Sequence, residues 1–167
     1  MITVTTEATT EPITVTEAKD WLGILTTAHD TKLTASIAAA RKKVEQLSGR
    51  SMVARTLKLI LDEYSETYLD LPYPPINAIV SVKSKATDGT ETTYSAADYA
   101  LVYNRLHFSG NGNAVEIAYT TLANAEEFYK LAIKKQLAYD YRNEYNENGF
   151  DKEVIKMIST VTLNVGY

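Results

Sequence analysis

The chain has 167 residues, of which 45% are hydrophobic and 23% charged, and this composition predicts a packed fold rather than a disordered chain. Its 17 basic and 21 acidic residues give a net charge of −4, which argues against general nucleic-acid binding, because phosphates require an accumulated basic surface. The absence of cysteine excludes disulfides, thiol catalysis and zinc–thiolate sites, and no apolar run approaches the roughly 18 to 20 residues that span a bilayer.

The N-terminal part predicts a tail followed by a short helix. Residues 1–12 are rich in Thr and Glu and end at Pro12. Thr14 and Glu17 have the spacing of a capping box, in which each side chain satisfies a backbone donor at a helix start. We therefore expect a helix from about Val15 to Ile24.

A second, longer helix is predicted from Asp30, the candidate N-cap, to Gly49, which stands where a left-handed C-cap belongs. Its apolar residues fall on one narrow helical stripe, whereas its charged residues lie off that stripe. The stripe consists of Leu33, Ile37, Ala40, Val44 and Leu47.

Residues 53–120 change to a period of two, which predicts a small antiparallel β unit. The segment "RTLKLILDEY" places Leu57, Leu59 and Leu61 on one face, and "TYLDL" is interpreted as its short partner strand. The turn signal "TDGT" predicts a hairpin. Further short strands are predicted at "INAIVSVKS", "YALVY", "RLHF" and "AVEIAYT", with "SGNGN" as the turn before the last.

Three prolines, Pro72, Pro74 and Pro75, precede the strand that we expect at Ile79. Each proline fixes φ and removes an amide donor, so this segment cannot lie inside a sheet. We interpret it as a stiff bend that joins the first β-ribbon to the following strand, and not as a ligand motif.

The helical period returns near the C-terminus. Asn124 and Glu127 resemble a cap, and the pattern predicts a helix over 125–146 that stops at "ENG". Its apolar residues spread around more than one face, which indicates a helix that is central in its own bundle or buried between subunits. The last segment, 149–167, has a short helical start and ends in the alternating stretch "TVTLNV".

This order of segments predicts an α+β fold. Its helical bundle core has two N-terminal helices and a long C-terminal helix, within residues 13–52 and 121–148. The antiparallel β unit, 53–120, is inserted into that core, and the N-terminal tail 1–12 and a C-terminal arm 149–167 flank it.

The sequence offers little support for catalysis, and we predict no catalytic, cofactor-binding or metal-binding residue. His29 and His107 stand alone in a loop and a strand, without a spaced second ligand. The acidic group Asp62, Glu63 and Glu66 lacks the spacing of a calcium-binding loop.

Two basic sets are interpreted as ordinary solvated or paired side chains. The run Arg41, Lys42 and Lys43 wraps around its helix, with Glu45 close behind, instead of forming one ridge. The third helix carries a second set among acidic neighbours, so local ion pairing is the simpler explanation. This set consists of Lys130, Lys134, Lys135 and Arg142.

Four local patterns, in this order, resemble the head–tail connector (adaptor) proteins of tailed bacteriophages. They are "EPITVTEAKDWLGI", the long helix "DTKLTASIAAARKKVEQLSGRSM", the strand "TLKLILDEY" leading to "LDLPYPPINAIVSVK", and the closing helix "YKLAIKKQLAYDYRNEY". Together the patterns cover about residues 11 to 145.

The resemblance implies a non-enzymatic structural protein of the virion neck, assembled in the bacterial cytoplasm. Such adaptors form a ring, usually a dodecamer, beneath the portal protein, and they receive the stopper or tail-completion protein. The ring extends the channel through which DNA passes without sequence-specific binding, and no cofactor or membrane is implied. A net negative charge suits a conduit in which DNA slides.

Helices that are apolar on several sides suit lateral packing in a ring, and an alternating terminal segment could add a strand to a neighbouring sheet. We therefore expect contacts to another subunit or partner from eight residues: Phe128, Leu131, Leu137, Tyr141, Tyr145, Val161, Leu163 and Val165. We also expect residues 151–167 to become ordered only against a partner, such as the portal.

Three alternatives remain open from the sequence. The chain could be a stopper or tail-completion protein of the same neck. It could be an enzyme or ligand-binding module, such as a hydrolase with a carboxylate pair, although no convergent residue set is visible. A DNA-binding regulator built on the helices would bind duplex DNA in a salt-dependent manner.

Overall fold

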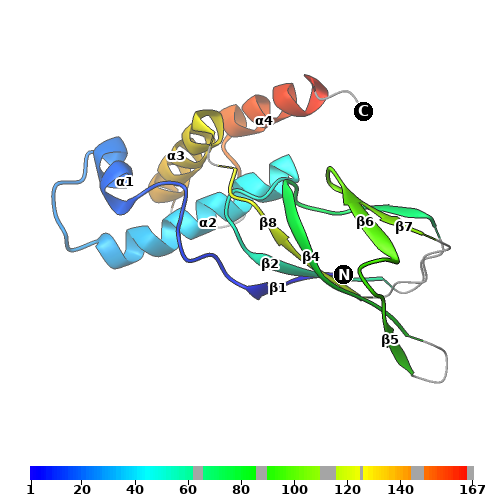
Figure 1. The fold of residues 1–167 in the computed structure, drawn as a ribbon. Coiled ribbons are helices and arrows are strands. Elements are labelled where there is room, and N and C mark those ends of the chain that lie inside the picture. Colours follow the sequence, from blue (N-terminus) through cyan, green and yellow to red (C-terminus); the bar gives the residue numbers. More distant parts are fainter. Residues whose placement is uncertain (62–65, 86–89, 110–115, 125, 144–148, 165–167) are drawn as a thin grey trace. The chain divides into compact units, whose positions relative to one another are not determined.

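The computed structural model describes residues 1–61, 66–85, 90–109, 116–124, 126–143 and 149–164 of two compact units. The first, here called the β unit, comprises Met1–Thr9 and Val53–Ala123, and the second, the helical unit, comprises Thr10–Met52 and Asn124–Tyr167. Each unit has its own hydrophobic core, and Figure 1 shows the helices of the one unit and the strands of the other. The predicted α+β class, with a helical core and a small antiparallel β unit, is confirmed.

Helix α1 (Val15–Leu22) of the helical unit begins at the predicted capping box. The Glu17 backbone N–H donates to the Thr14 hydroxyl at 3.1 Å, and the Thr14 N–H donates to the Glu17 carboxylate at 2.8 Å. The hydrogen bond from the Thr14 backbone N–H, followed by that from the Thr14 hydroxyl, lowers the pKa of Glu17. Two orphan donors of the first turn are thereby satisfied by side chains that are three residues apart.

Helix α2 (Asp30–Ser48) ends as predicted and begins differently. Gly49 adopts φ 65° in the left-handed region, and its N–H donates to the Glu45 carbonyl at 2.9 Å. The prediction of Asp30 as N-cap is wrong, because His29 holds that position without a side-chain hydrogen bond. Asp30 is the first helical residue, and its carboxylate accepts from Lys19 at 3.0 Å.

Helix α3 (Glu127–Arg142) is shorter than the predicted span 125–146. The predicted Asn124 cap is wrong, since Glu126 holds the N-cap position without a side-chain hydrogen bond. Asn143 ends the helix, and its side chain donates to the Tyr139 carbonyl at 2.8 Å.

The C-terminal segment is a helix, α4 (Lys152–Asn164), and the prediction of a terminal alternating strand is wrong. The Asp151 carboxylate accepts from the backbone N–H groups of Glu153 at 2.7 Å and Val154 at 3.1 Å, which starts the helix. Val154 and Ile158 are buried in the core of the helical unit. The described part of the segment is thus ordered against its own chain, contrary to the expectation that it needs a partner.

A buried amide fixes the approach to α4. Gln136 has no exposed surface, and its side-chain nitrogen donates to the Gly149 carbonyl at 3.1 Å, while its oxygen accepts from the Asp151 N–H at 3.0 Å. Lys43 donates to the same Gly149 carbonyl at 3.0 Å and to Asp140 at 2.8 Å. The start of α4 is therefore tied to both α2 and α3.

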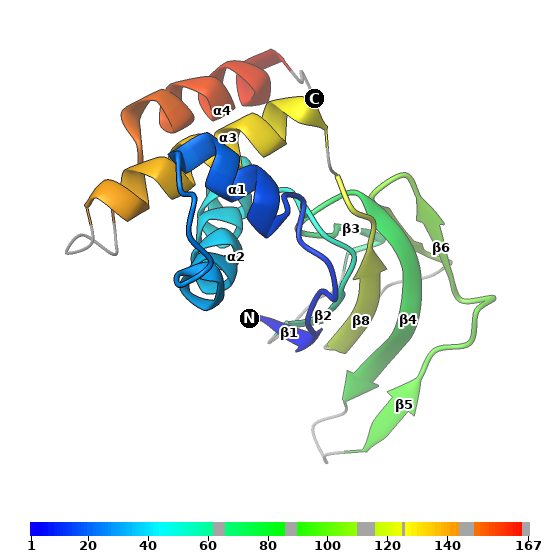
Figure 2. The same cartoon turned by 90° about the vertical axis from the view of Figure 1, so that its left-hand side faces the viewer.

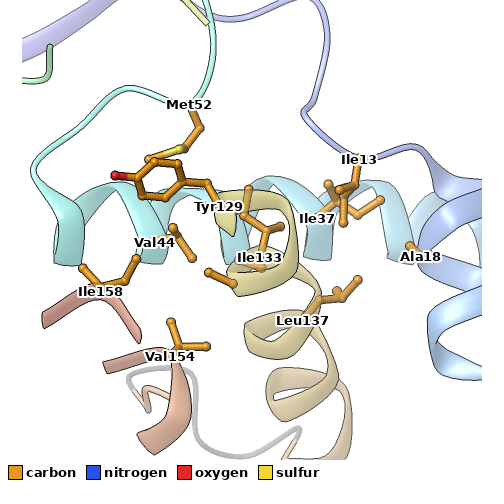
Figure 3. Close-up of a cluster of buried hydrophobic side chains, with 12 residues drawn as sticks. Ile13, Ala18, Ile37, Val44, Met52, Tyr129, Ile133, Leu137, Val154 and Ile158 are labelled. Carbon is orange, nitrogen blue, oxygen red and sulfur yellow. The ribbon is translucent and has the colours of Figure 1, made fainter. Parts of the chain in front are cut away.

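The core of the helical unit lies between α2 and α3 and is closed by α1 and α4 (Figure 3). Its α2 side chains come from the predicted apolar stripe, although Leu47 is only partly buried. The buried core residues are Ile13, Ala18, Ile37, Ala40, Val44, Met52, Tyr129, Ala132, Ile133, Leu137, Val154 and Ile158.

Arg41 lies inside the helical unit, and the interpretation of this residue as part of a solvated face is wrong. It is 2% exposed, and its guanidinium donates to Glu45 at 2.8 Å and to Glu11 at 2.7 Å. The second Glu45 oxygen accepts from the Met52 backbone N–H at 2.8 Å. A buried charge requires such pairing, since leaving it unpaired would cost several kcal/mol, on the order of 3–5.

The β unit contains two antiparallel sheets of described strands (Figure 2). The larger has the order β1-β2-β8-β4-β5, and the smaller has the order β3-β7-β6. Leu57 pairs with Tyr119 and Leu59 with Ile117, so the predicted apolar face of β2 is buried. The strands are β1 (Ile2–Thr6), β2 (Thr56–Ile60), β3 (Tyr68–Asp70), β4 (Ile76–Lys85), β5 (Glu91–Thr93), β6 (Tyr99–Val102), β7 (Arg105–Phe108) and β8 (Glu116–Thr121).

Two pairings differ from the sequence predictions. The expected tail contains an edge strand, since β1 pairs with β2 through Ile2 opposite Leu59 and Val4 opposite Leu57. The segment "TYLDL" does not pair with β2; its strand β3 pairs with β7 in the smaller sheet. The predicted β4–β5 hairpin is confirmed by its register, although residues 86–89 of its turn and 110–113 of the "SGNGN" segment lie outside the described residues.

The prolines lie outside the strands, as predicted, between β3 and β4. Strand β4 begins at Ile76, directly after Pro75, and not at Ile79. The buried Tyr119 hydroxyl donates to the Pro72 carbonyl at 2.8 Å, and burial raises the pKa of this tyrosine, so the donor keeps its proton. The Leu122 N–H donates to the Pro75 carbonyl at 2.9 Å. The first and the last proline of the bend are therefore hydrogen-bonded to Tyr119 of β8 and to Leu122, which directly follows β8.

We predict that Ile158→Ala destabilises the helical unit by about 2–5 kcal/mol, because it opens a cavity where α4 contacts the core. Ile155→Ala is the matched control on the same helix; this residue is 44% exposed, and its truncation should change stability by about 0.5 kcal/mol or less. Urea unfolding followed by the far-UV helical signal measures both. Equal effects of the two variants would contradict the docked position of α4.

We predict that Arg41→Ala costs about 3–5 kcal/mol, because it leaves the Glu45 carboxylate buried without its cation. Adding Glu45→Gln should recover part of this loss, since the amide oxygen can still accept from Met52 and no charge remains. Urea unfolding compares both with the exposed control Lys42→Ala. A loss at Arg41 no larger than at Lys42 would show that the buried pair is unimportant.

Candidate interaction surfaces

The described residues contain no group of three or more His, Cys, Asp and Glu side chains placed to hold a metal ion. His29 stands at the start of α2 and His107 in β7. Of the acidic group, Glu66 is exposed, and Asp62 and Glu63 lie outside the described residues. No helix within the described ranges is long and apolar enough to cross a membrane.

The lysines of α3 form ion pairs, but the predicted local pairing is confirmed only for Lys130. Lys130 pairs with Glu127 at 2.8 Å within the helix, Lys134 with Glu17 of α1 at 3.6 Å, and Lys135 with Glu153 of α4. Two of these three partners belong to other helices, so the pairs also link helices. Arg142 is exposed and has no ion pair with another described residue.

The predicted contact residues of α3 and α4 have unequal exposure. Leu131 is 38% exposed, whereas Phe128, Tyr141 and Val161 are half-buried. Leu137 is wholly buried in the core of its own unit, so its assignment to a partner contact is wrong. Leu163 falls within α4, and Tyr145 and Val165 lie outside the described residues.

The structure instead shows a pocket of about 430 Å³ in the helical unit, here called the Trp21 pocket. Trp21 of α1 is 46% exposed at its wall, and the last turns of α3 and the start of α4 complete it. Its chemistry combines aromatic rings with cationic, acidic and amide groups. The lining residues are Trp21, Lys135, Ala138, Tyr139, Arg142, Asn143, Asp151 and Glu153.

The β unit presents an exposed aromatic at the β6–β7 turn. Tyr103 is 91% exposed and adopts φ 57°, a left-handed conformation that is uncommon for a residue with a side chain. Its neighbour Asn104 accepts from the Leu71 N–H at 3.1 Å through its carbonyl and from the Ile76 N–H at 2.9 Å through its side chain. These bonds fix the turn to both ends of the proline bend, so Tyr103 is held outward.

The outer face of the smaller sheet is ordered by stacking and ion pairing. Tyr68 lies opposite His107, and Asp70 opposite Arg105, in the β3–β7 register. The Arg105 guanidinium lies 4.5 Å from the Tyr68 ring centroid and pairs with both Asp70 oxygens, one of them at 2.9 Å. Tyr68 is 45% exposed, so this face presents an aromatic side chain to solvent. The charge of Arg105 beside it is neutralised by Asp70.

Sequence reasoning missed Trp21 and Tyr103. The signal for Tyr103 was available, because only Asn104, a common turn residue, separates "YALVY" from "RLHF", so Tyr103 lies beside the turn. Trp21 had no such signal: a single tryptophan on a short helix is equally compatible with a core position.

We predict that Arg105→Gln raises the pKa of Asp70 toward its ordinary value. The Arg105 hydrogen bonds hold this pKa below that value, with the charges of Arg105 and His107 adding to the effect. Because the folded-state pKa is lowered, the pair contributes at neutral pH and is lost as pH falls through the Asp70 pKa. An NMR titration of the Asp70 carboxyl group measures the shift. Lys58→Gln, on the other sheet, should leave it unchanged, and an equal shift there would contradict the assignment.

A sequence model described as head completion protein matches residues 11–162, a range that runs through both units. No curated protein matches the chain. Among solved structures, the chain is similar to one from the neck of an empty gene transfer agent (GTA) particle computed with C6 symmetry. The two share 21% identity and a TM-score of 0.76, over 96% of this chain and 94% of that one.

Two further structures give the same result. A chain from the virion of the native GTA particle has 20% identity and a TM-score of 0.76, over 96% of this chain and 94% of that one. A chain from the native GTA neck, computed with C12 symmetry, has 19% identity and a TM-score of 0.72, over 96% and 93%. At these identities the likeness shows a shared fold, whereas the sequence match covers most of the chain and confirms the resemblance drawn above. The chain belongs to the head completion protein family.

Proposed function

We propose that this chain is a structural head–tail adaptor of a tailed phage. In this proposal it forms a ring, a dodecamer, beneath the portal protein, extends the DNA channel, and receives the stopper or tail-completion protein. The observation that carries the proposal is the head completion protein match across residues 11–162, which includes the helices and the β unit in one family pattern.

The likeness to the GTA structures supports a place in the neck of the particle. Two of those structures are described as necks, computed with C6 and C12 symmetry. Cyclic symmetry requires each subunit to offer two different surfaces, one to each neighbour. This chain has candidates for such surfaces, because both of its units expose aromatic side chains although each has a closed core of its own.

Surface charge supports a role in which DNA passes without being held. The net charge is −4, and the described lysines of α3 are matched by carboxylates. Phosphate contacts supply most of the affinity in non-specific DNA binding, so a surface with few unmatched cations grips DNA weakly. On α3, the exposed Arg142 adds one charge without a carboxylate partner among the described residues, so this helix offers DNA little to bind.

A stopper or tail-completion protein of the same neck is the second candidate, because it would share the family name and a location in the particle. The two roles differ in their nearest partner. An adaptor contacts the portal directly, whereas a stopper contacts the adaptor, so the order of addition during assembly separates them.

We predict that phage particles carry this chain at the neck and that deletion of its gene leaves heads filled with or leaking DNA, without tails. Electron microscopy of purified particles measures both, and complementation with the intact gene is the control. A ring found between the portal and the next neck protein supports the adaptor role. Tailed, infectious particles that lack the chain would refute the proposal, and a ring found only below another ring would favour the stopper.

A further inference from the structure

The two surfaces described above belong to different units and differ in kind. One is an outward aromatic side chain on a fixed turn, and the other is a pocket with aromatic and cationic walls. A closed ring of identical subunits is built from head-to-tail contacts, in which one surface of each copy meets a different surface of the next. The inference that follows rests on the proposed ring and names a contact within it.

Tyr103 has the properties of an anchor residue. Its ring is 91% exposed, and Val102 beside it is 45% exposed, so the tip of the β6–β7 turn is apolar and aromatic. Asn104 fixes the turn through its two accepted hydrogen bonds, so docking would order little additional chain. Tyrosines that are held rigidly before binding contribute strongly to interfaces, because little conformational entropy is lost on contact.

The Trp21 pocket has the size to receive such a side chain. Its volume of about 430 Å³ lies within the range of roughly 300–1,000 Å³ that is typical of ligand pockets, so an aromatic ring and a flanking residue can enter. Trp21 and Tyr139 offer ring faces and edges for stacking. The Asn143 side-chain oxygen can accept a hydrogen bond from a phenolic hydroxyl.

Arg142 supplies the most specific part of the match. The described chain twice places a guanidinium against a tyrosine ring: Arg105 lies 4.5 Å from the Tyr68 centroid, and Arg55 lies 5.5 Å from that of Tyr73. Arg142 lines the pocket, is exposed, and has no ion pair with another described residue. An incoming tyrosine would give it the cation–π partner that the other two arginines have within their own unit.

We propose that Tyr103 of one copy inserts into the Trp21 pocket of the next copy in the ring. The ring of Tyr103 stacks against Trp21 and Arg142, and its hydroxyl bonds Asn143. The contact uses the β unit of one subunit and the helical unit of its neighbour, so it is directional and can be repeated around a closed circle.

Cross-linking tests this contact directly, because the chain has no native cysteine and each introduced thiol is therefore the single thiol of its chain. Particles are assembled with a mixture of two single variants, Val102→Cys and Ala138→Cys, and treated with a short bis-maleimide. Val102 is 45% exposed beside Tyr103, so a thiol at this position leaves the Tyr103 ring in place. A covalent dimer of the two variants is expected, and the double variant should give a ladder of larger species. The matched control is a mixture of Leu25→Cys and Ala138→Cys, which should not cross-link. Leu25 is 98% exposed and lies outside both surfaces.

A second measurement removes the contact without introducing a thiol. Tyr103→Ser and Arg142→Glu should each lower incorporation into the neck by about tenfold or more, while Tyr103→Phe retains most of it and Leu25→Ser has no effect. Circular dichroism of each purified variant verifies its fold.

The outcomes distinguish this contact from the proposed function. Necks that contain a normal ring but give no cross-link, or that incorporate Tyr103→Ser fully, overturn the contact and leave the adaptor role intact. Particles that contain no ring of this chain overturn the adaptor role, and the contact with it.

Discussion

The fold depends on one buried ion pair of the helical unit, Arg41 with Glu45. Arg41 also binds Glu11, and Glu45 also accepts from the Met52 backbone. Glu11 and Met52 stand next to two of the points where the chain passes between its units, after Thr9 and before Val53. The pair therefore fixes both ends of the first helical segment. A buried charge is stable only where its partners neutralise it. The pair therefore holds Glu11 and Met52 in place on either side of the helical segment, and the helical core can close although the β unit is inserted after Met52.

What the sequence predicted correctly depends on interactions between near neighbours. The Thr14–Glu17 box, the Gly49 cap and the alternation over 57–61 are satisfied within a few residues, so their patterns are sufficient. The errors concern partners that are distant in sequence. Nothing local shows that β3 pairs with β7, that β1 extends the larger sheet, or that Arg41 is buried. In the segment that becomes α4, the alternation of "TVTLNV" indicates a strand, whereas the spacing of Val154 and Ile158 indicates a helix. The segment is a helix because Val154 and Ile158 pack into the core with α2 and α3.

The candidate interaction surfaces were predicted less well than the fold, for a related reason. A helix that is apolar on several sides can be central in its own unit or buried between subunits, and the sequence alone does not separate these cases. Leu137 belongs to the first case, because α3 is covered by α1, α2 and α4 of the same chain. Exposed aromatics such as Trp21 and Tyr103 have no periodicity of their own. Trp21 lies on the short capped helix α1, and Tyr103 lies on a turn that Asn104 fixes. The exposure of these two side chains is therefore known only once the surrounding elements have been placed.

The two separate cores leave the exposed side chains of both units without a role in core packing. Hydrophobic burial stabilises each unit from within, and neither core contains Tyr103, Arg142 or Leu25. Truncating an exposed side chain changes stability little, whereas truncating an anchor in an interface weakens association strongly. Folding and assembly thus depend on different residues of this chain. A variant that keeps its helical signal and loses its place in a particle therefore reports on a contact between subunits, because the fold itself does not require the altered surface.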